Sequence, residues 1–243
     1  GAEDLITERG AALLKEADVV VYAGSLVNPG HLKRCRPEAE LHDSSRMNLE
    51  EQVEVMARGV LEGKKVVRLH TGDPSLYGAI REQMDALDVN GISYDVTPGV
   101  SSFSGAAAAL QAEYTLPDVS QSVIITRMAG RTPVPEGEAL RKMASHGCTM
   151  VLFLSTGLLE EVERELMAGG YAPDTPAAIV YKATWPEERV FRCTVSTLAE
   201  TARTNGVTKT ALITVGRFLG EDYERSKLYD PTFTHGCRKG TEV

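Results

Sequence analysis

The sequence lacks the motifs that mark several large classes of enzyme. It has no GxGxxG or GxxxxGK[ST] phosphate loop, which excludes Rossmann dehydrogenases and P-loop nucleotidases. It has no GxSxG or HExxH motif, and no residues spaced as a nucleophile with its base, so nothing supports covalent or hydrolytic catalysis. It also has no apolar run of about 18 residues and no basic-then-apolar leader. We therefore expect neither a membrane span nor a secretory signal.

Cysteine is scarce, and histidine shows no ligand spacing. The four cysteines are far apart and form no CxxC pair, so we expect no metal site. Scattered thiols in a chain of this size are usually core residues of a protein from a reducing compartment, which predicts a cytoplasmic location. The cysteines are Cys35, Cys148, Cys193 and Cys237.

The chain has fewer basic than acidic residues. The chain has 26 Lys+Arg against 34 Asp+Glu, a formal net charge of −8. Such a balance excludes a protein that binds nucleic acid or an anionic membrane through its overall field. A few local cations can still hold an anionic small molecule.

Short β-branched runs alternate with amphipathic stretches along the 243 residues, which predicts an α/β fold. Asn48 with Glu51 predicts a capping box at the start of a helix. The stretch 189–194 alternates and predicts an antiparallel strand. We expect domains at 1–115 and 116–220, then an extended tail at 221–243. The predicted buried strands are 19–22, 66–69, 94–97, 123–126, 149–154, 178–181 and 211–215.

Three turns directly follow predicted strands, at 71–78, 97–102 and 181–186. Ligands of α/β sheets bind at the carboxyl ends of strands, so these loops are candidate binding loops. Each also has an ordinary structural explanation. Asp73 is a good N-cap and Pro74 a good first helical residue, and a lone Trp185 is more often packing than recognition. The residues alone leave both interpretations open.

Two arginines lie in a loop that contains two prolines, at 126–135. Loop arginines are usually solvated. A rigid loop carrying the forked guanidiniums of Arg127 and Arg131 is nevertheless well suited to binding carboxylates.

The loops 71–78, 98–102 and 181–184 resemble the tetrapyrrole (class III) methyltransferases of cobalamin biosynthesis. The segments 131–135, 183–186 and 203–206 are similar, more narrowly, to the precorrin-4 C11-methyltransferases of that family. The likeness runs from Gly1 to about Leu219. It implies two α/β domains with S-adenosylmethionine in a cleft between them, S-adenosylhomocysteine as product, and a homodimer.

The resemblance also implies site residues. The reaction implied is C11 methylation of precorrin-4 to precorrin-5. For this reaction the protein mainly has to align the ring carbon, the methyl group and the sulfur and to exclude water, rather than to supply a base. No catalytic residue is therefore assigned. Candidates for the substrate carboxylates are Arg127, Arg131, Lys182 and Arg46. The implied cofactor positions are Gly72, Asp73, Leu76, Tyr77, Ser101, Ser102, Leu154, Ala183, Ala211 and Leu212.

Family members begin with a strand and a glycine-rich loop before the segment that corresponds to Asp4–Thr7, where this sequence has only Gly1, Ala2 and Glu3. The resemblance therefore predicts a natural chain longer by one strand and its loop, on the order of 10 residues. Three alternatives stay open: a cobalt-containing substrate, another ring position, and, more distantly, a non-catalytic nucleotide-binding module.

Overall fold

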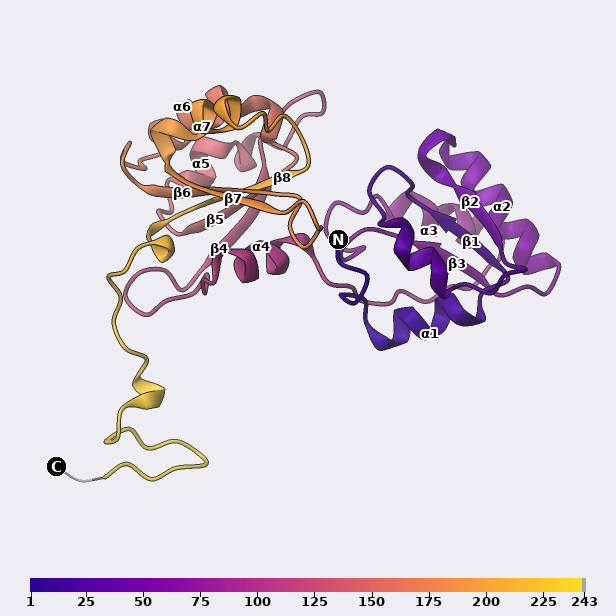
Figure 1. The fold of residues 1–243 in the computed structure, drawn as a ribbon, viewed down its shortest axis with the longest axis horizontal. Coiled ribbons are helices and arrows are strands. Elements are labelled where there is room, and N and C mark those ends of the chain that lie inside the picture. Colours follow the sequence, from indigo (N-terminus) through magenta and orange to yellow (C-terminus); the bar gives the residue numbers. More distant parts are fainter. Residues whose placement is uncertain (242–243) are drawn as a thin grey trace. The chain divides into compact units, whose positions relative to one another are not determined.

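The computed structural model describes residues 1–241 and divides into two units, which begin at Gly1 and at Gly105. Figure 1 shows the chain coloured along its sequence. The sequence predicts a domain boundary after residue 115. In the structure the units meet at Ser104 and Gly105, inside helix α4 (Ser102–Leu110). Each unit is described by itself.

The first unit is built on a parallel sheet with the strand order β2-β1-β3. Its strands are β1 (Val19–Tyr22), β2 (Glu40–Asp43) and β3 (Val66–Leu69). Helix α1 (Glu8–Glu16) packs on one face through Leu14, against Val20. Helices α2 (Leu49–Leu61) and α3 (Arg81–Val89) pack on the other face, against Val21. The central strand is apolar throughout because both of its faces are covered.

Helix α2 begins where the sequence predicts. Asn48 Oδ1 accepts a hydrogen bond from the Glu51 N–H at 2.9 Å, and Glu51 Oε2 accepts one from the Asn48 N–H at 2.8 Å. The reciprocal pair satisfies two backbone donors that no helical carbonyl reaches. The predicted capping box is therefore confirmed.

The predicted strand at 94–97 is wrong, because no strand forms there in the described chain. A strand needs a neighbour for its backbone groups, and β3 pairs only with β1. Tyr94 and Val96 are instead exposed on an unpaired extended segment. β2 was not predicted, because the sequence Glu-Leu-His-Asp has no apolar run.

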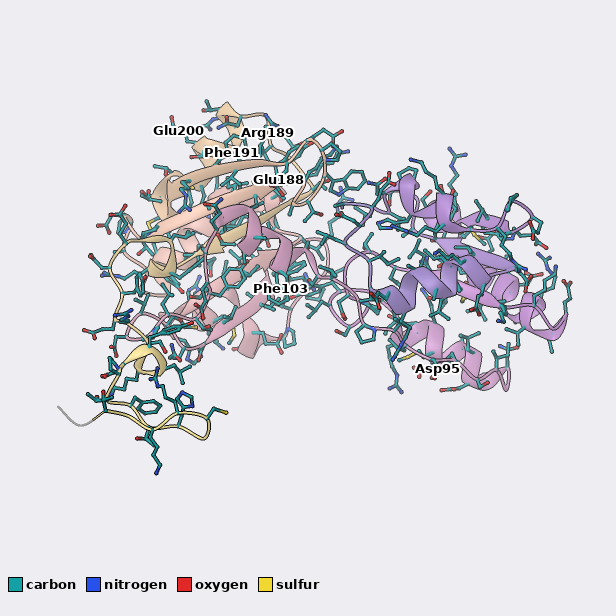
Figure 2. The ribbon with its side chains drawn as sticks, turned by 60° about the horizontal axis from the view of Figure 1, so that its bottom comes forward. Asp95, Phe103, Glu188, Arg189, Phe191 and Glu200 are labelled. Carbon is teal, nitrogen blue, oxygen red and sulfur yellow. The ribbon has the colours of Figure 1, made fainter. Side chains whose placement is uncertain are left out.

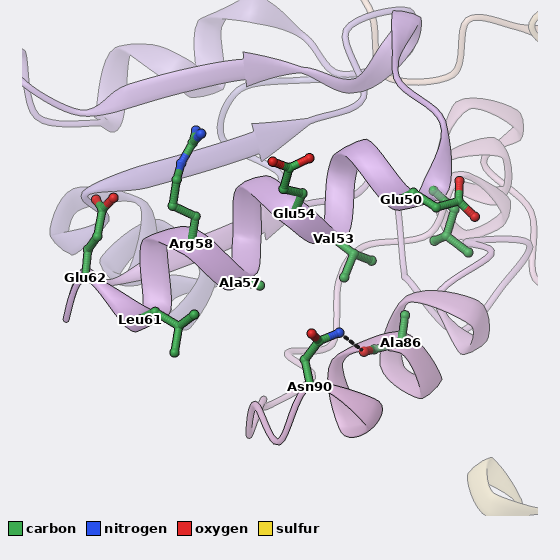
Figure 3. Close-up of a pocket in the computed structure, with 10 residues that line it drawn as sticks. Glu50, Val53, Glu54, Ala57, Arg58, Leu61, Glu62, Ala86 and Asn90 are labelled. Atoms are coloured by element: carbon green, nitrogen blue, oxygen red, sulfur yellow. Dashed lines mark hydrogen bonds between the residues drawn. The ribbon is translucent and has the colours of Figure 1, made fainter.

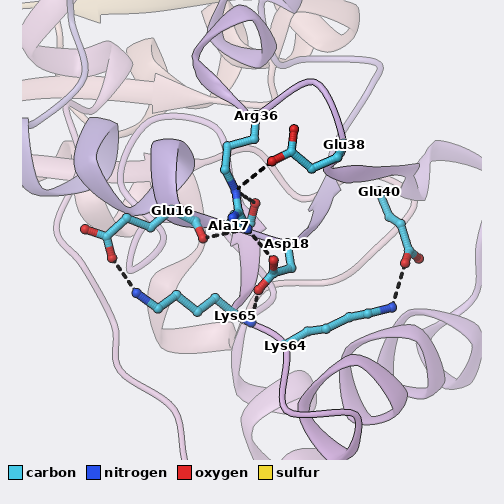
Figure 4. A network of polar contacts seen from close by, with 8 residues as sticks. All are labelled: Glu16, Ala17, Asp18, Arg36, Glu38, Glu40, Lys64 and Lys65. Atoms are coloured by element: carbon cyan, nitrogen blue, oxygen red, sulfur yellow. Dashed lines mark hydrogen bonds and ion pairs between the residues drawn. The ribbon is translucent and has the colours of Figure 1, made fainter.

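Charged side chains connect the amino ends of the three strands (Figure 4). Asp18, just before β1, pairs with Arg36 and accepts the Lys65 backbone N–H at 2.7 Å. Lys64 lies 2.7 Å from Glu40 on β2. These exposed contacts are individually weak, but they join segments that adjoin each strand.

The second unit contains a mixed sheet with the strand order β4-β5-β8-β6-β7. β4, β5 and β6 run in one direction, and β7 and β8 run in the other. The predicted antiparallel strand at 189–194 is confirmed as β7. The antiparallel direction of β8 was not predicted, because its apolar run is typical of a parallel strand. The strands are β4 (Val123–Arg127), β5 (Thr149–Phe153), β6 (Pro176–Tyr181), β7 (Arg189–Thr194) and β8 (Ala211–Val215).

Helices α5 (Leu140–Ala144), α6 (Leu159–Ala168) and α7 (Leu198–Thr204) lie along one face of this sheet (Figure 1). The core between them is fully apolar, and truncating one of its large side chains to alanine costs about 2–5 kcal/mol. Its largest buried members are Met150, Leu152, Leu166, Ile179, Leu198 and Ile213.

Between β8 and residue 241 the chain forms two short 3-10 turns, Arg217–Leu219 and Lys227–Tyr229, and an isolated bridge between His235 and Arg238. Arg238 organises its end by donating from Nη2 to the carbonyls of Leu228 and Asp230 at 2.8 and 2.6 Å. Residues 242–243 of the predicted tail lie outside the described residues.

Candidate functional site

A hydrogen bond joins two predicted loops of the first unit. Asp73 Oδ2 accepts a hydrogen bond from the Gly99 N–H at 2.9 Å. A Cβ atom added at Gly99 would lie 2.0 Å from the Gly72 carbonyl oxygen, so only glycine fits there. At Gly72, where φ is +61°, an added Cβ would lie 3.5 Å from Ser101 Cα. The structure thus brings the predicted residues Gly72, Asp73 and Ser101 together.

Asp73 is not the N-cap of a helix. Residues 74–77 form a turn, and α3 begins only at Arg81. Asp73 Oδ1 accepts the Ser75 N–H at 2.9 Å, which closes the turn. Hydrogen bonds from the Ser75 side chain and the Gly99 N–H lower the pKa of Asp73. The helix expected at Pro74 is wrong, and the carboxylate shapes the loops instead.

Two of the predicted cofactor positions have a strained backbone. Tyr77 and Leu154 have φ values of 56° and 52°, although neither is glycine. Their side chains are 45% and 71% exposed. Left-handed backbone costs a residue with a Cβ roughly 1–2 kcal/mol, and such strain concentrates at ligand sites. An exposed apolar side chain on strained backbone at a strand end is a suitable surface for an organic ligand.

The second unit gathers its predicted positions at one edge of its sheet, where β5 and β6 end and β8 begins. The Lys182 N–H donates to the Thr210 carbonyl at 2.9 Å, and both residues have positive φ. Thr156 Oγ1 donates to the Ala211 carbonyl at 3.1 Å. β8 lies between β5 and β6, so these bonds hold three adjacent strand ends together. The predicted residues gathered at this edge are Leu154, Lys182, Ala183, Ala211 and Leu212.

Helix α4 approaches the loop after β6 more closely than the sequence indicated. A Cβ at Gly105 would lie 2.8 Å from Thr184 Cγ2 and 3.7 Å from Ala183 Cβ. Thr184 itself has a φ of 68°. Gly105 was missed as a site residue, although a glycine in an alanine-rich helix is a recognisable signal of close packing. The predicted Ser102 is the first residue of this helix.

The two predicted loop arginines differ in what they contact. Arg127 donates from Nη1 to the Thr132 carbonyl at 3.1 Å and from Nη2 to the Pro133 carbonyl at 2.6 Å. Its guanidinium therefore holds its own loop in shape. Arg131 is exposed within that loop. Arg46, on the first unit, is exposed at the end of the 3-10 turn Ser44–Arg46.

Lys182 lies among aromatic rings. Its Nζ is 5.8 Å from the Tyr181 ring centroid and 5.4 Å from that of Trp185. Glu187 Oε2 lies 3.5 Å from the same Nζ. Trp185 thus contacts a predicted site residue rather than serving only as packing.

Two basic residues that precede the 71–78 loop are half-buried: Arg68 on β3, and His70 just after β3 ends. Arg68 donates from Nη1 to the carbonyls of Val21 and Leu69 at 3.2 and 3.1 Å. Burial, with the Arg68 charge, lowers the pKa of His70 to about 4. His70 is therefore neutral near pH 7, directly before Thr71.

A groove of about 690 Å³ lies between α2 and α3, and none of the predicted site residues lines it (Figure 3). Val53 and Ala57 form its apolar floor, and Glu50, Glu54 and Arg58 stand at its rim. None of its lining residues has a positive φ. The strained loops of each unit, rather than this groove, carry the predicted site residues.

Residues 1–241 contain no cluster of His, Cys, Asp and Glu that could hold a metal ion. Within the same residues, no helix is both long and apolar enough to cross a membrane.

Comparison with known proteins gives consistent matches. Residues 1–199 match the family profile described as Tetrapyrrole (Corrin/Porphyrin) Methylases. A cobalt-precorrin-4 C(11)-methyltransferase from Methanocaldococcus jannaschii is 51% identical, over 98% of this chain and 93% of its own. A precorrin-4 C(11)-methyltransferase from Mycobacterium tuberculosis is 43% identical, over 94% of this chain and 92% of its own.

Two solved structures extend the comparison. The X-ray structure of a cobalt precorrin-4 methyltransferase matches with a TM-score of 0.89 and 49% identity, covering 91% of this chain and 92% of its own. A uroporphyrin-III C-methyl transferase from Thermus thermophilus, complexed with S-adenosylhomocysteine, matches with a TM-score of 0.74 and 26% identity. That match covers 90% of this chain and 94% of the other.

Proposed function

The chain belongs to the tetrapyrrole methylases, and we propose that within this family it methylates carbon 11 of precorrin-4 or of its cobalt complex, with S-adenosylmethionine as methyl donor, in cobalamin biosynthesis. The observation that carries the proposal is identity of 43–51% over nearly the whole chain to relatives named for this reaction. Differences in substrate position within the family accompany much lower identity, such as 26% to the uroporphyrin-III enzyme.

The residues present fit S-adenosylmethionine. Gly72 and Gly99 let the two loops after their strands lie against each other, and Leu154 offers an exposed apolar surface. When bound, S-adenosylmethionine supplies an activated methyl group on a sulfonium, whose departure leaves a neutral thioether. We propose as cofactor residues Gly72, Asp73, Leu76, Tyr77, Ser101, Ser102, Leu154, Ala183, Ala211 and Leu212.

The protein's own work is then binding, alignment and exclusion of water. Asp73 keeps the two loops of the first unit at a fixed separation through Gly99. Thr156 and Lys182 fix the strand ends of the second unit. Holding reacting groups in line can supply several kcal/mol of a barrier, roughly 7–11 in the best intramolecular cases, without an acid or base.

The substrate class carries acetate and propionate carboxylates, and we propose that Arg131 and Lys182 bind some of them. Arg127 supports this binding through its loop, and Arg46 is a further candidate on the first unit. A forked guanidinium on a stiff loop matches a carboxylate in charge and geometry. These local cations work against an overall charge of −8.

Incubation with S-adenosylmethionine and precorrin-4, followed by mass spectrometry and NMR of the product, tests the proposal. We expect a gain of one methyl group, attached at carbon 11. Methylation at another carbon identifies a different enzyme of the family. Binding of S-adenosylhomocysteine without any methyl transfer favours a non-catalytic module.

The cobalt complex is a second candidate substrate, favoured by the higher identity, 51% against 43%, to the relative named for it. Parallel assays with metal-free and cobalt-containing precorrin-4 distinguish the two through the ratio of their kcat/KM values. We further propose a cytoplasmic homodimer, which light scattering on the purified protein tests for its oligomeric state.

A further inference from the structure

The β6–β7 turn carries a second cation whose surroundings differ from those of Lys182. Arg189, the first residue of β7, is directly opposite Tyr181 in the antiparallel register. Its guanidinium carbon is 4.9 Å from the Tyr181 ring centroid and 5.4 Å from that of Phe191. Figure 2 labels Arg189 and Phe191. Two aromatic rings therefore support one exposed guanidinium.

The neighbouring carboxylates are engaged elsewhere. Glu188 Oε2 accepts the Thr184 backbone N–H, which fixes the turn. Glu187 lies 3.5 Å from the Lys182 ammonium. None of the ion pairs in residues 1–241 includes Arg189. The guanidinium thus keeps its charge without a carboxylate partner in the described part of the chain.

Stacking on rings leaves the in-plane N–H groups of a guanidinium available. A carboxylate approaching the edge of the plane can accept two parallel hydrogen bonds while the faces remain on the aromatic rings. The rings also reduce the number of side-chain conformations of Arg189, so less entropy is lost on binding. A lysine in the same place would offer charge without the fork.

The position of Arg189 connects it to the candidate site. Tyr181 ends β6, and the same edge of the sheet carries Lys182, Ala183 and the start of β8. Tyr181 is shared between the two cations, with Lys182 Nζ at 5.8 Å from its ring centroid. Arg189 and Lys182 therefore both lie close to the Tyr181 ring, at the end of β6 that leads into the predicted Lys182–Ala183 loop.

We propose that Arg189 is a substrate-binding residue that holds a carboxylate of the tetrapyrrole, with Tyr181 and Phe191 as its support. The inference rests on the proposed function, because it assumes a polycarboxylate tetrapyrrole substrate. It adds to Lys182 and Arg131 a cation that no sequence motif indicated.

The test uses uroporphyrin, a stable polycarboxylate tetrapyrrole, and its fully esterified methyl ester, with binding followed by fluorescence. We expect Arg189→Gln to weaken binding of the acid about tenfold, as is typical for the loss of a charge-assisted hydrogen bond. Arg189→Lys should give an intermediate affinity. Arg164→Gln, at an exposed position of α6, is the control of equal charge change and should bind as the unmodified protein does.

The ester separates carboxylate recognition from a general effect on the fold. Arg189→Gln and the unmodified protein should bind the ester equally, and their affinities for S-adenosylhomocysteine and their melting temperatures should agree.

Equal binding of the acid by both proteins, including no binding by either, overturns the proposal. If Arg189→Gln does not fold, Arg189→Lys decides: an affinity for the acid equal to that of the unmodified protein overturns the proposal. Absence of methyl transfer to precorrin-4 is a separate result, which contradicts the proposed function and leaves the binding measurement valid.

Discussion

Asp73 and Gly99 join two loops of the first unit through one hydrogen bond, 2.9 Å from the Gly99 N–H to Asp73 Oδ2. The other carboxylate oxygen closes its own turn on Ser75. One side chain thus sets both the shape of a loop and its distance from the next.

Replacing Asp73 tests that role. Asp73→Ala leaves the Gly99 N–H without its acceptor, and we expect the Kd for S-adenosylhomocysteine to rise roughly 10- to 100-fold, from a loss of about 1.5–3 kcal/mol. Asp73→Asn keeps one acceptor oxygen and should lose less. Calorimetric titration of the three proteins measures the effect, and an unchanged Kd in Asp73→Ala contradicts it.

Gly105 is expected to tolerate no side chain while Thr184 keeps its methyl group. An added Cβ lies 2.8 Å from Thr184 Cγ2, so Gly105→Ala should lower the free energy of unfolding by about 1–3 kcal/mol. Thr184→Ser removes the clashing methyl and should rescue much of this loss in the double variant. Gly137→Ala is the control, because nothing lies within 4 Å of its added Cβ. Urea unfolding of the four variants and the parent decides; a stable Gly105→Ala would show that α4 shifts freely.

Arg131 and Arg127 should differ in what their loss changes. Arg131→Ala should raise KM for the tetrapyrrole about tenfold and leave the melting temperature and cofactor affinity nearly intact, because the exposed side chain contributes only to binding. Arg127→Ala should raise KM and also lower the melting temperature, because the carbonyls of Thr132 and Pro133 lose their shared donor. Steady-state kinetics and calorimetry on both variants measure the two effects. Tetrapyrrole kinetics unchanged in Arg131→Ala would remove that residue from the site.

His70 should make the protein less stable in mild acid. Burial lowers its pKa from 6.5 to about 4, so between these pH values the unfolded chain binds a proton that the folded chain does not. Stability therefore falls as the pH falls from 6.5 toward 4. His70→Gln should flatten that part of the profile of unfolding free energy against pH. A variant profile that parallels the parent's would exclude His70 as the cause.

Below this pH range, the stability of the protein depends on carboxylates of the first unit. Hydrogen bonds to Lys65 lower the pKa values of Glu16 and Asp18, and Lys64 does the same for Glu40. Their contribution to stability is present above the ordinary carboxyl pKa values and is lost as the pH falls through the lowered ones. The two pH ranges can be separated because His70 of the unfolded chain is already fully protonated at the pH where the carboxylates begin to titrate.

The sequence predicted those parts of the fold that depend on neighbours along the chain. The apolar runs predicted β1, β3, β4, β5, β6 and β8, and the capping box predicted the start of α2. Segment 94–97 failed because a strand also requires a partner, which the local sequence does not specify. β2 was missed because a half-exposed edge strand carries polar residues.

The candidate site was predictable in its positions and not in its contacts. The motifs located the loops around Gly72 and Ala183, where the structure finds close approaches and strained backbone. Arg127 was expected to bind substrate, yet its hydrogen bonds to its own loop depend on carbonyl directions that no motif encodes. Gly105 became visible only through Thr184, far from it in the sequence, and Arg189 only through the strand pairing that places it opposite Tyr181.

The positive φ values of Tyr77, Leu154 and Lys182 set a limit on how this protein can be improved. Glycine at any of them would relieve roughly 1 kcal/mol of strain, partly offset by the greater freedom of the unfolded chain. A selection for heat resistance alone would therefore accept exchanges at these loops, and each would remove a side chain proposed to contact a ligand. Thermal tolerance and turnover are opposed at these three positions, so stabilising changes belong in the cores and at the helix ends.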